Sequence, residues 1–419
     1  MNSAPGEMTA EIAPPAIQGP RPLPLHLALT TLLSMNSIAA LSSLRNGSLS
    51  WNPELAAKAH DLTEALATFS PDEVAKAVET ELCHRMSGFA NGVQLYRRTL
   101  REPAAPVNVI HSIGTTRLLD FGTDLVADAP PVLIIPSLVN RYTVLDLGNG
   151  QSFIRMLAAQ GFHPYVVDWG APGEEEKSFD LTAYITARLE PLLAVVHART
   201  GNRTIDLIGY CMGGLLALAV GARQQDKIST LTLLATPWDF HTGHAAQIRM
   251  LVSMMPQLDA LIDLMGEFPV EVLQAMFTSL DPWLTLEKFQ RFSRMEPDSE
   301  KARAFIGLED WLNDGVPLAG PAARDCLQGW YVENHPLKGR WKIDGTPVLP
   351  QNIHFPTLSV IPGRDHIVPP ASARALADAL PLSEAIVAEA GHIGMVAGGR
   401  AKKILHDPLV AWLKKNQRN

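Results

Sequence analysis

Short apolar runs alternate with longer segments of helical periodicity through much of the chain. The strand-like runs cover residues 131–136, 164–169, 204–208 and 229–235, and the helical segments between them cover 152–160, 181–197 and 213–224. Apolar runs of this length indicate buried strands, and the helical segments are long enough for about two and a half turns or more. Repeated strand–helix alternation predicts an α/β protein with a mostly parallel, doubly wound sheet and helices on both faces.

This alternation is interrupted once and preceded by a different pattern. Residues 240–350 are rich in helical signals, and strand-like runs resume only at 357–361 and 384–388, with a helix over 371–380 between them. An insertion at this point predicts a cap over a site at the sheet. The expected segments are a disordered leader, a helical N-terminal region, the first part of the core, the cap and the second part of the core, over residues 1–24, 25–87, 88–239, 240–350 and 351–419.

The N-terminal region carries no clear targeting signal. Six prolines within residues 1–24 predict disorder there. Residues 25–44 are apolar but interrupted by serine and threonine, so they fall short of the roughly 20 apolar residues that a membrane span needs. We interpret them as an amphipathic or docking segment, with association with a membrane or lipid-like body as the alternative. Helices are expected to start near Asn52 and at Ser70, where a proline follows the cap position.

Composition narrows the class of protein. The chain has 419 residues, 47% of them hydrophobic, which is ample for a large core. A net charge of −8 without any basic block argues against a nucleic-acid partner. The three cysteines, Cys83, Cys211 and Cys326, are odd in number and far apart. They predict no disulfide framework, and a reducing cytoplasm is the expected location.

The segment Gly-Tyr-Cys-Met-Gly-Gly at 209–214 is the main chemical signal. It joins a predicted strand to a predicted helix through a turn flanked by glycines, which is the pattern of a nucleophile elbow. Elbows usually carry serine, whereas this one carries Cys211. A thiolate is a strong nucleophile and forms thioesters readily, so the pattern favours acyl transfer. A buried structural thiol is the alternative for Cys211.

Two later residues complete a candidate triad. In α/β-hydrolases the nucleophile is followed along the chain by an acid and then by a histidine. Asp365 follows the strand at 357–361, and His392 lies in a loop after the strand at 384–388. Their order and context predict an α/β-hydrolase fold with a helical cap and a helical N-terminal extension. Asp365 could instead brace its loop, His392 could be a turn residue, and the neighbouring His366 reads as a loop-packing residue.

Tetrahedral intermediates of acyl transfer need an oxyanion hole. The backbone N–H of Met212, directly after the nucleophile, is the expected first donor. The second should come from the loop at 136–140, where Leu138 and Val139 both fit. His241 and His244 have spacing for a metal pair, but no third ligand accompanies them, and we expect neither a metal nor a separate cofactor.

Together these segments resemble polyhydroxyalkanoate synthases, and most closely the shorter class III type. That family carries a lipase-like box with cysteine in place of serine. The similar segments are residues 136–147, 166–172, 209–214, 236–242, 333–334, 337–339 and 365–370, within a resemblance that spans about 88–415. The N-terminal 87 residues are longer than those of a minimal class III catalytic subunit, and the cap is less similar than the core.

The resemblance implies that Cys211 takes the acyl group from a 3-hydroxyacyl-CoA, with His392 activating the thiol. Asp365 would position His392 or activate the substrate hydroxyl. CoA would then be part of a substrate, and the product would be a polyester. The resemblance also implies a homodimer, a partner subunit of the class III type and association with the surface of a polymer granule. A thioesterase or esterase with a cysteine nucleophile is the alternative, followed by a non-catalytic granule- or complex-associated protein.

Overall fold

A computed structural model describes residues 19–101, 105–122, 128–148, 152–243 and 245–417 of the chain. Within them, eight strands form one sheet in the order β1-β2-β4-β3-β5-β6-β11-β12. The strands are β1 Asn108–Ile113, β2 Thr116–Asp120, β3 Pro131–Ile135, β4 His163–Asp168, β5 Ile205–Tyr210, β6 Ile228–Leu234, β11 Thr357–Pro362 and β12 Ser383–Ala388. The pairs from β4 to β12 are parallel, whereas β2 pairs antiparallel with both β1 and β4.

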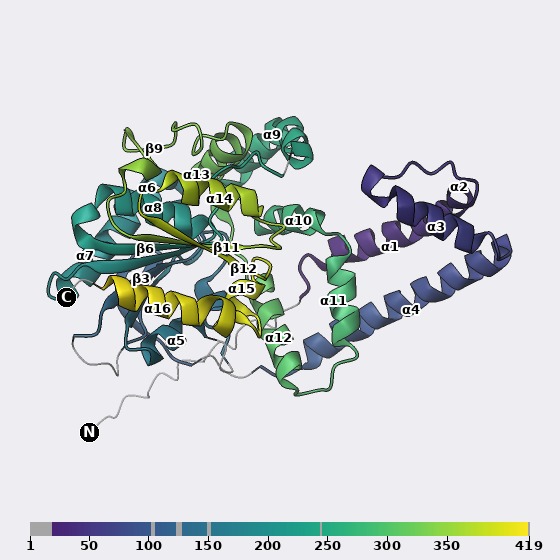
Figure 1. Cartoon of the computed structure of the whole chain (residues 1–419), viewed down its shortest axis with the longest axis horizontal. Coiled ribbons are helices and arrows are strands. Elements are labelled where there is room, and N and C mark those ends of the chain that lie inside the picture. Colours follow the sequence, from purple (N-terminus) through teal and green to yellow (C-terminus); the bar gives the residue numbers. More distant parts are fainter. Residues whose placement is uncertain (1–18, 102–104, 123–127, 149–151, 244, 418–419) are drawn as a thin grey trace, which may run out of the picture.

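Helices cover both faces of this sheet (Figure 1). The core helices are α5 Phe153–Ala159, α6 Leu181–Tyr184, α7 Glu190–Arg199, α8 Met212–Arg223, α14 Pro370–Ala379, α15 Gly394–Ala397 and α16 Asp407–Asn416. Alternate side chains of the strands enter two apolar clusters: Leu133 packs with α7, α8 and α14, whereas Ile134 packs with α5 and α16. This alternation follows from the two-residue period of a strand, and it confirms the doubly wound sheet predicted from the sequence.

The insertion between β6 and β11 is mainly helical. It contains α9 Ala245–Met265, α10 Val270–Leu280, α11 Leu284–Phe292, α12 Glu300–Asn313 and α13 Gly320–Arg324, and the two-residue strands β7 Glu267–Phe268, β8 Leu318–Ala319, β9 Lys342–Ile343 and β10 Thr346–Pro347. Asn334, in the later part of the insertion, contacts its start, because its side chain accepts from the N–H of Phe240 and donates to the Asp239 carboxylate. The helical insertion predicted from the sequence is therefore present, and it begins and ends beside the sheet.

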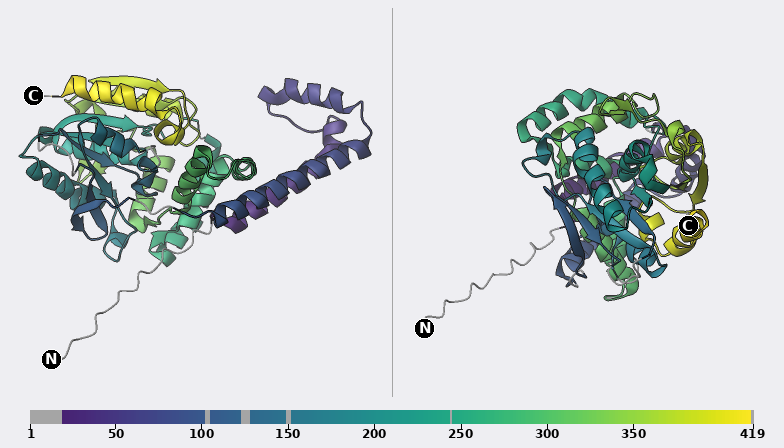
Figure 2. Two further views of the ribbon diagram at one scale, coloured as in Figure 1. Left: turned by 90° about the horizontal axis from the view of Figure 1, so that it is seen from below. Right: turned by 90° about the vertical axis from the view of Figure 1, so that its left-hand side faces the viewer.

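The N-terminal helices form an arm that projects from the rest of the molecule. They are α1 Leu23–Ala39, α2 Leu41–Arg45, α3 Ala56–Leu66 and α4 Pro71–Arg98. In Figures 1 and 2, α1 and α4 run side by side away from the body. Ser70 and Glu73 form a reciprocal capping box at the start of α4. Near its other end, α4 packs on α11, where the rings of Phe89 and Tyr96 meet Phe289 edge to face.

Two expectations for the N-terminal region need correction. The helix α4 continues through residue 88 to Arg98, and the first strand begins only at Asn108. Residues 1–18 of the predicted leader lie outside the described residues, but the leader's last six residues are placed: Gly19 and Pro20 are buried, and α1 already starts at Leu23. The start of α4 at Pro71 agrees with the proline signal. Among the helices that the structure describes, none is both long and apolar enough to cross a bilayer.

Candidate active site

Cys211 occupies a sharp turn between β5 and α8. Its backbone has φ 56° and ψ −127°, a conformation that residues other than glycine rarely adopt. The turn is held in place because the Cys211 N–H donates to the Leu234 carbonyl at 2.8 Å, and the Gly214 N–H donates to the Cys211 carbonyl at 2.9 Å. A strained residue fixed in this way at a strand–helix junction is the geometry of a nucleophile elbow.

The glycines of the motif make this turn possible. A methyl group on Gly213 would lie 2.5 Å from the carbonyl oxygen of Pro136 and closer still to that of Ile135. On Gly214 it would lie 2.7 Å from the Thr236 Cγ2, and on Gly209 it would run into the Cα of Gly214. Each separation is too short for a real Cβ, so the spacing of glycines around Cys211 is a steric requirement of the elbow.

The structure brings Asp365 and His392 to the elbow. Asp365 follows β11 and His392 follows β12, and the Asp365 Oδ2 accepts a hydrogen bond from the His392 Nδ1 at 2.6 Å. The other carboxylate oxygen, Oδ1, accepts from the backbone N–H groups of Ile367 and Val368 at 2.8 and 2.9 Å. The Asp365 side chain is fully buried, and His392 also hydrogen-bonds Cys211. The three side chains thus form a continuous chain of polar contacts in the predicted order.

The charges and hydrogen bonds among these three side chains favour the protonated form of His392. Burial is the largest single influence on His392 and acts to lower its pKa, but the negative charge of Cys211 and the hydrogen bonds to Asp365 and Cys211 together raise that pKa from 6.5 to about 10. These contacts therefore favour the protonated form of His392 beside Cys211. Cys211 itself directly precedes the N-terminus of α8, where the helix dipole favours negative charge.

Two tyrosines lie beside the contacts that join Cys211, His392 and Asp365, and the sequence analysis did not identify them. The Tyr210 hydroxyl donates to the backbone carbonyl of His392 at 3.4 Å, and the two rings lie 5.3 Å apart. Burial, together with the charges of Cys211 and Asp365, raises the pKa of Tyr210 well above its usual value. Burial and the Cys211 charge also raise the pKa of Tyr331, from the cap. Both hydroxyl groups therefore remain protonated beside Cys211.

A cavity of about 370 Å³ opens onto Cys211 and His392. Its walls come from the loop after β3, from α10, α11 and α12 of the cap, and from the triad loops. His366 is exposed and lines this cavity without joining the Asp365–His392 pair. Pro20, Arg21 and His26 of the N-terminal arm complete the wall, which no sequence pattern indicated. The site thus combines residues from the arm, the core and the cap.

Comparison with known proteins identifies the fold and the family of the chain. Residues 130–398 match the sequence family described as the alpha/beta hydrolase fold. The poly(3-hydroxyalkanoate) polymerase subunit PhaC of Allochromatium vinosum is 30% identical over 290 residues, which cover 68% of this chain and 81% of the relative. The chain belongs to the poly(3-hydroxyalkanoate) polymerase subunit family. The corresponding Synechocystis protein is also 30% identical, over 68% of this chain and 78% of its own length.

Family membership confirms the resemblance seen in the sequence and makes the chain an enzyme of the acyltransferase class. The α/β-hydrolase fold of this polymerase-family member is also confirmed. A more distant likeness extends to a solved esterase structure from Thermogutta terrifontis, with 19% identity, 76% of this chain and 100% of that chain covered, and a TM-score of 0.44.

The three residues predicted for an oxyanion hole lie in different surroundings. Met212 starts α8 directly after Cys211. Leu138 is buried in the core, whereas Val139 lines the cavity and its N–H donates to the Ser137 hydroxyl at 3.3 Å. The Trp169 indole N–H donates to the Pro136 carbonyl at 3.0 Å and fixes the start of this loop. The choice of second donor remains a prediction.

Of the two histidines with metal-pair spacing, only His241 belongs to the described residues. The Nε2 of His241 lies 3.2 Å from the carbonyl oxygens of both Tyr331 and Val332, so this nitrogen carries a proton and faces backbone acceptors. His244 lies outside the described residues. Among the residues that are described, no three histidine, cysteine, aspartate or glutamate side chains group together as metal ligands.

Proposed function

We propose that this chain polymerises 3-hydroxyacyl-CoA into a polyester, with Cys211 as the covalent anchor and CoA as the released product. The observation that carries the proposal is the hydrogen-bonded series Cys211–His392–Asp365 at the elbow, open to a cavity. The names of the relatives support the same reaction, since each is a poly(3-hydroxyalkanoate) polymerase subunit. CoA takes part as the thiol half of the substrate, and we propose no separate cofactor.

In the acylation step, the Cys211 thiolate attacks the thioester carbonyl of the substrate. The N–H of Met212 and a donor from the loop at 136–140 would stabilise the oxyanion, each by roughly 2.7–4 kcal/mol if they act as such donors do elsewhere. The bond between the acyl carbon and the CoA sulfur then breaks. His392, protonated beside the thiolate, gives its proton to the departing CoA thiolate, so the products are free CoA and a Cys211 thioester.

In the elongation step, the 3-hydroxyl of one acyl unit attacks the thioester of another. His392, now neutral, takes the hydroxyl proton; an ester bond forms, and the bond to the Cys211 sulfur breaks. Asp365 has two candidate roles, orienting His392 or activating the hydroxyl. Both of its carboxylate oxygens are occupied, one by His392 and one by two backbone N–H groups, and its side chain is fully buried. This supports the orienting role.

The test supplies 3-hydroxybutyryl-CoA to the purified chain, alone and with a candidate partner subunit, and follows CoA release together with product size. Insoluble polyester supports the proposal, whereas free 3-hydroxy acid as the only product means that water accepts the acyl group and the chain is a thioesterase. Cys211→Ala should abolish CoA release and leave the fold intact. Cys83→Ala is the matched control, because Cys83 is exposed on α4. CoA release at the normal rate by Cys211→Ala would contradict the mechanism.

We also propose that α1 contacts the apolar surface of the polyester product. This helix buries a polar stripe, His26, Thr30 and Ser34, while Leu32 and Met35 are 57% and 62% exposed. Exposed apolar side chains on one face of a projecting helix favour contact with an apolar surface. This supports the docking role expected for residues 25–44.

A further inference from the structure

The N-terminal segment at residues 19–26 lies far from Cys211 in sequence but belongs to the same cavity. Pro20, Arg21 and His26 line that cavity together with Cys211 and His392. This segment is packed into the molecule and is not only a connection to the arm, because Gly19, Pro20 and His26 are all buried.

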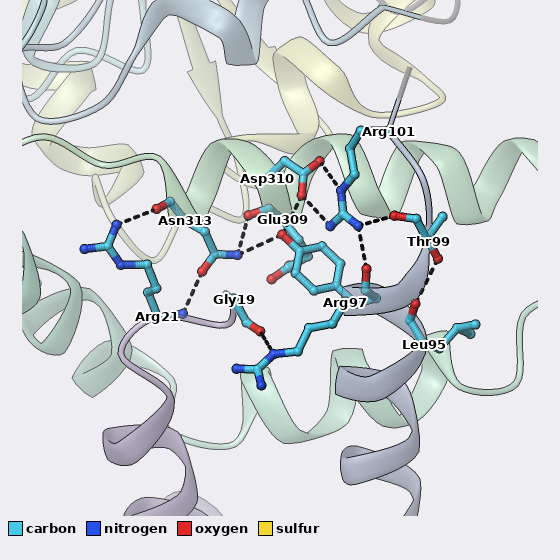
Figure 3. Close-up of polar contacts among 10 residues, drawn as sticks. Gly19, Arg21, Leu95, Arg97, Thr99, Arg101, Glu309, Asp310 and Asn313 are labelled. Carbon is cyan, nitrogen blue, oxygen red and sulfur yellow. Dashed lines mark hydrogen bonds and ion pairs between the residues drawn. The ribbon is translucent and has the colours of Figure 1, made fainter. Parts of the chain in front are cut away.

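Asn313, at the C-terminus of α12, makes the central contacts (Figure 3). Its Oδ1 accepts from the backbone N–H of Arg21 at 2.6 Å, and its backbone carbonyl accepts from the Arg21 guanidinium at 3.2 Å. Its Nδ2 donates to the Tyr96 hydroxyl at 3.2 Å and to the Glu309 carbonyl at 2.6 Å. Asn313 is only 4% exposed, so its side-chain amide is fully used in joining residue 21, α4 and α12.

Gly19 allows this approach. A methyl group at Gly19 would lie 2.6 Å from the Cγ of Asn313 and nearer still to its Nδ2. The Asn313 amide cannot swing aside without losing its hydrogen bonds. On its other side, the Gly19 carbonyl accepts from the Arg97 side chain at 3.1 Å, as Figure 3 shows. Gly19 is therefore enclosed between α12 and α4.

A second set of contacts fixes the end of α4 to α12. The Asp310 carboxylate accepts from the Tyr96 hydroxyl at 2.5 Å and from the Arg101 guanidinium at 2.9 and 3.0 Å. The Arg101 guanidinium also stacks 4.5 Å from the centre of the Tyr96 ring. The next residues of α12, Trp311 and Leu312, line the cavity. The arm and the cavity therefore share one helix as a common wall.

We propose that residues 19–26 are a fixed wall of the catalytic cavity and that Asn313 is the positioning residue that holds this wall closed over Cys211. The proposal rests on the acyl-transfer function assigned to Cys211. A closed wall keeps water from the Cys211 thioester, so that a substrate hydroxyl rather than water accepts the acyl group. The arm thereby determines the ratio of polyester to free acid without touching the reacting atoms.

The test compares Gly19→Ala with Gly399→Ala in the full-length chain. Each variant adds one methyl group, but Gly399 is exposed, with no atom within 4 Å of its added Cβ and without a positive φ. Iodoacetamide labelling followed by peptide mass spectrometry measures the rate at each cysteine separately. Gly19→Ala should raise the Cys211 rate about fivefold, the factor expected when about 1 kcal/mol of hydrogen bonding to the closed wall is lost. Gly399→Ala should leave this rate unchanged.

The other two cysteines act as internal references. Cys83 is exposed and should react equally in both variants, whereas Cys326 is buried and reports unfolding of the cap. If Cys326 also becomes reactive, Arg21→Ala replaces Gly19→Ala, because it removes the side-chain bonds to the Asn313 carbonyl and to Glu271 without adding a methyl group. An unchanged Cys211 rate in the variant that stays folded would overturn the proposal.

Product analysis with 3-hydroxybutyryl-CoA gives the functional readout. In Gly19→Ala, the displaced wall should increase the fraction of free 3-hydroxy acid several-fold while the rate of CoA release changes little, because acylation does not need the wall. An equal loss of both products would mean a merely structural role and would refute the proposal. The labelling result does not depend on turnover. The two proposals can therefore fail separately. If the proposed function is wrong, the wild-type chain releases no CoA; if the proposed wall is wrong, the labelling rate of Cys211 does not change.

Discussion

Replacing Gly213 by alanine tests whether the elbow depends on close backbone contact. Gly213 is the second residue of α8, and an added methyl group would lie 2.5 Å from the carbonyl oxygen and 2.6 Å from the carbonyl carbon of Pro136. Non-bonded heavy atoms normally stay about 3.5 Å apart, so the elbow must move by roughly 1 Å relative to β3. The obstacle is backbone at the end of a buried strand, which cannot rotate away as a side chain can.

The displacement has two expected costs. Overpacking in a core lowers the free energy of unfolding by about 1–3 kcal/mol. A shift of about 1 Å at Cys211, away from His392 and the oxyanion donors, can lower the catalytic rate by about 10²-fold. Gly221→Ala is the matched control in the same helix, because its added methyl group would lie 3.2 Å from the Cζ of Phe355. At position 221, alanine favours the helix by about 0.5–1 kcal/mol, which offsets the slightly close contact with Phe355, so we expect activity to be unchanged.

Two measurements on each variant decide the outcome. The midpoint of urea unfolding, followed by tryptophan fluorescence, reports stability, and CoA release from 3-hydroxybutyryl-CoA reports the rate. We expect Gly213→Ala to lose both and Gly221→Ala to lose neither. If Gly213→Ala released CoA at the wild-type rate, the close packing of the elbow against β3 would not be what positions Cys211.

Two further predictions concern the triad and the arm. Asp365 and Cys211 together raise the pKa of His392 to about 10, so Asp365→Asn should lower that pKa. The imidazolium that is proposed to protonate CoA is then lost at a lower pH. When CoA release is measured between pH 6 and 11, its alkaline limit should therefore move down relative to wild type and to the exposed control Asp378→Asn. An unmoved alkaline limit would argue against Asp365 as the partner of His392. Met35→Glu should weaken co-sedimentation with polyester particles, whereas Met250→Glu, on α9 with the same 62% exposure, should not; equal effects would remove α1 as the specific contact.

The sheet and the elbow could be predicted because their signals are local. The strands β3, β5 and β11 are buried in full, and burial on both faces leaves mostly apolar residues in the sequence, without a regular polar alternation. Cys211 was identified by glycines that the turn requires, and Asp365 and His392 by loops that follow strands. The hydrogen bond of 2.6 Å between these last two agrees with that interpretation, while their catalytic roles stay predictions.

The predicted end of the N-terminal helical region, at residue 87, was wrong for a physical reason. Gly88 and Gly92 lie inside α4 and weaken its helical signal, so the sequence pattern changes near residue 88 although the helix continues. Their purpose is packing: a methyl group on Gly92 would lie 2.8 Å from the backbone carbonyl carbon of Phe289, and one on Gly88 would lie 2.8 Å from the side chain of Gln290. Glycine here allows α4 and α11 to approach closely, which no reading of α4 alone could reveal.

The contact of residues 19–26 with the cavity was likewise invisible in the sequence, because it joins Arg21 to Asn313 across 292 positions. This contact bears on the choice between polymerase and thioesterase, which the triad alone does not make. Cys211, His392 and Asp365 would catalyse acylation in the same way for either outcome. The two reactions diverge only when water or a hydroxyl reaches the thioester, and access to that bond depends on the cavity wall. The residues that separate the two functions should therefore lie in the arm and on α12 rather than at the elbow.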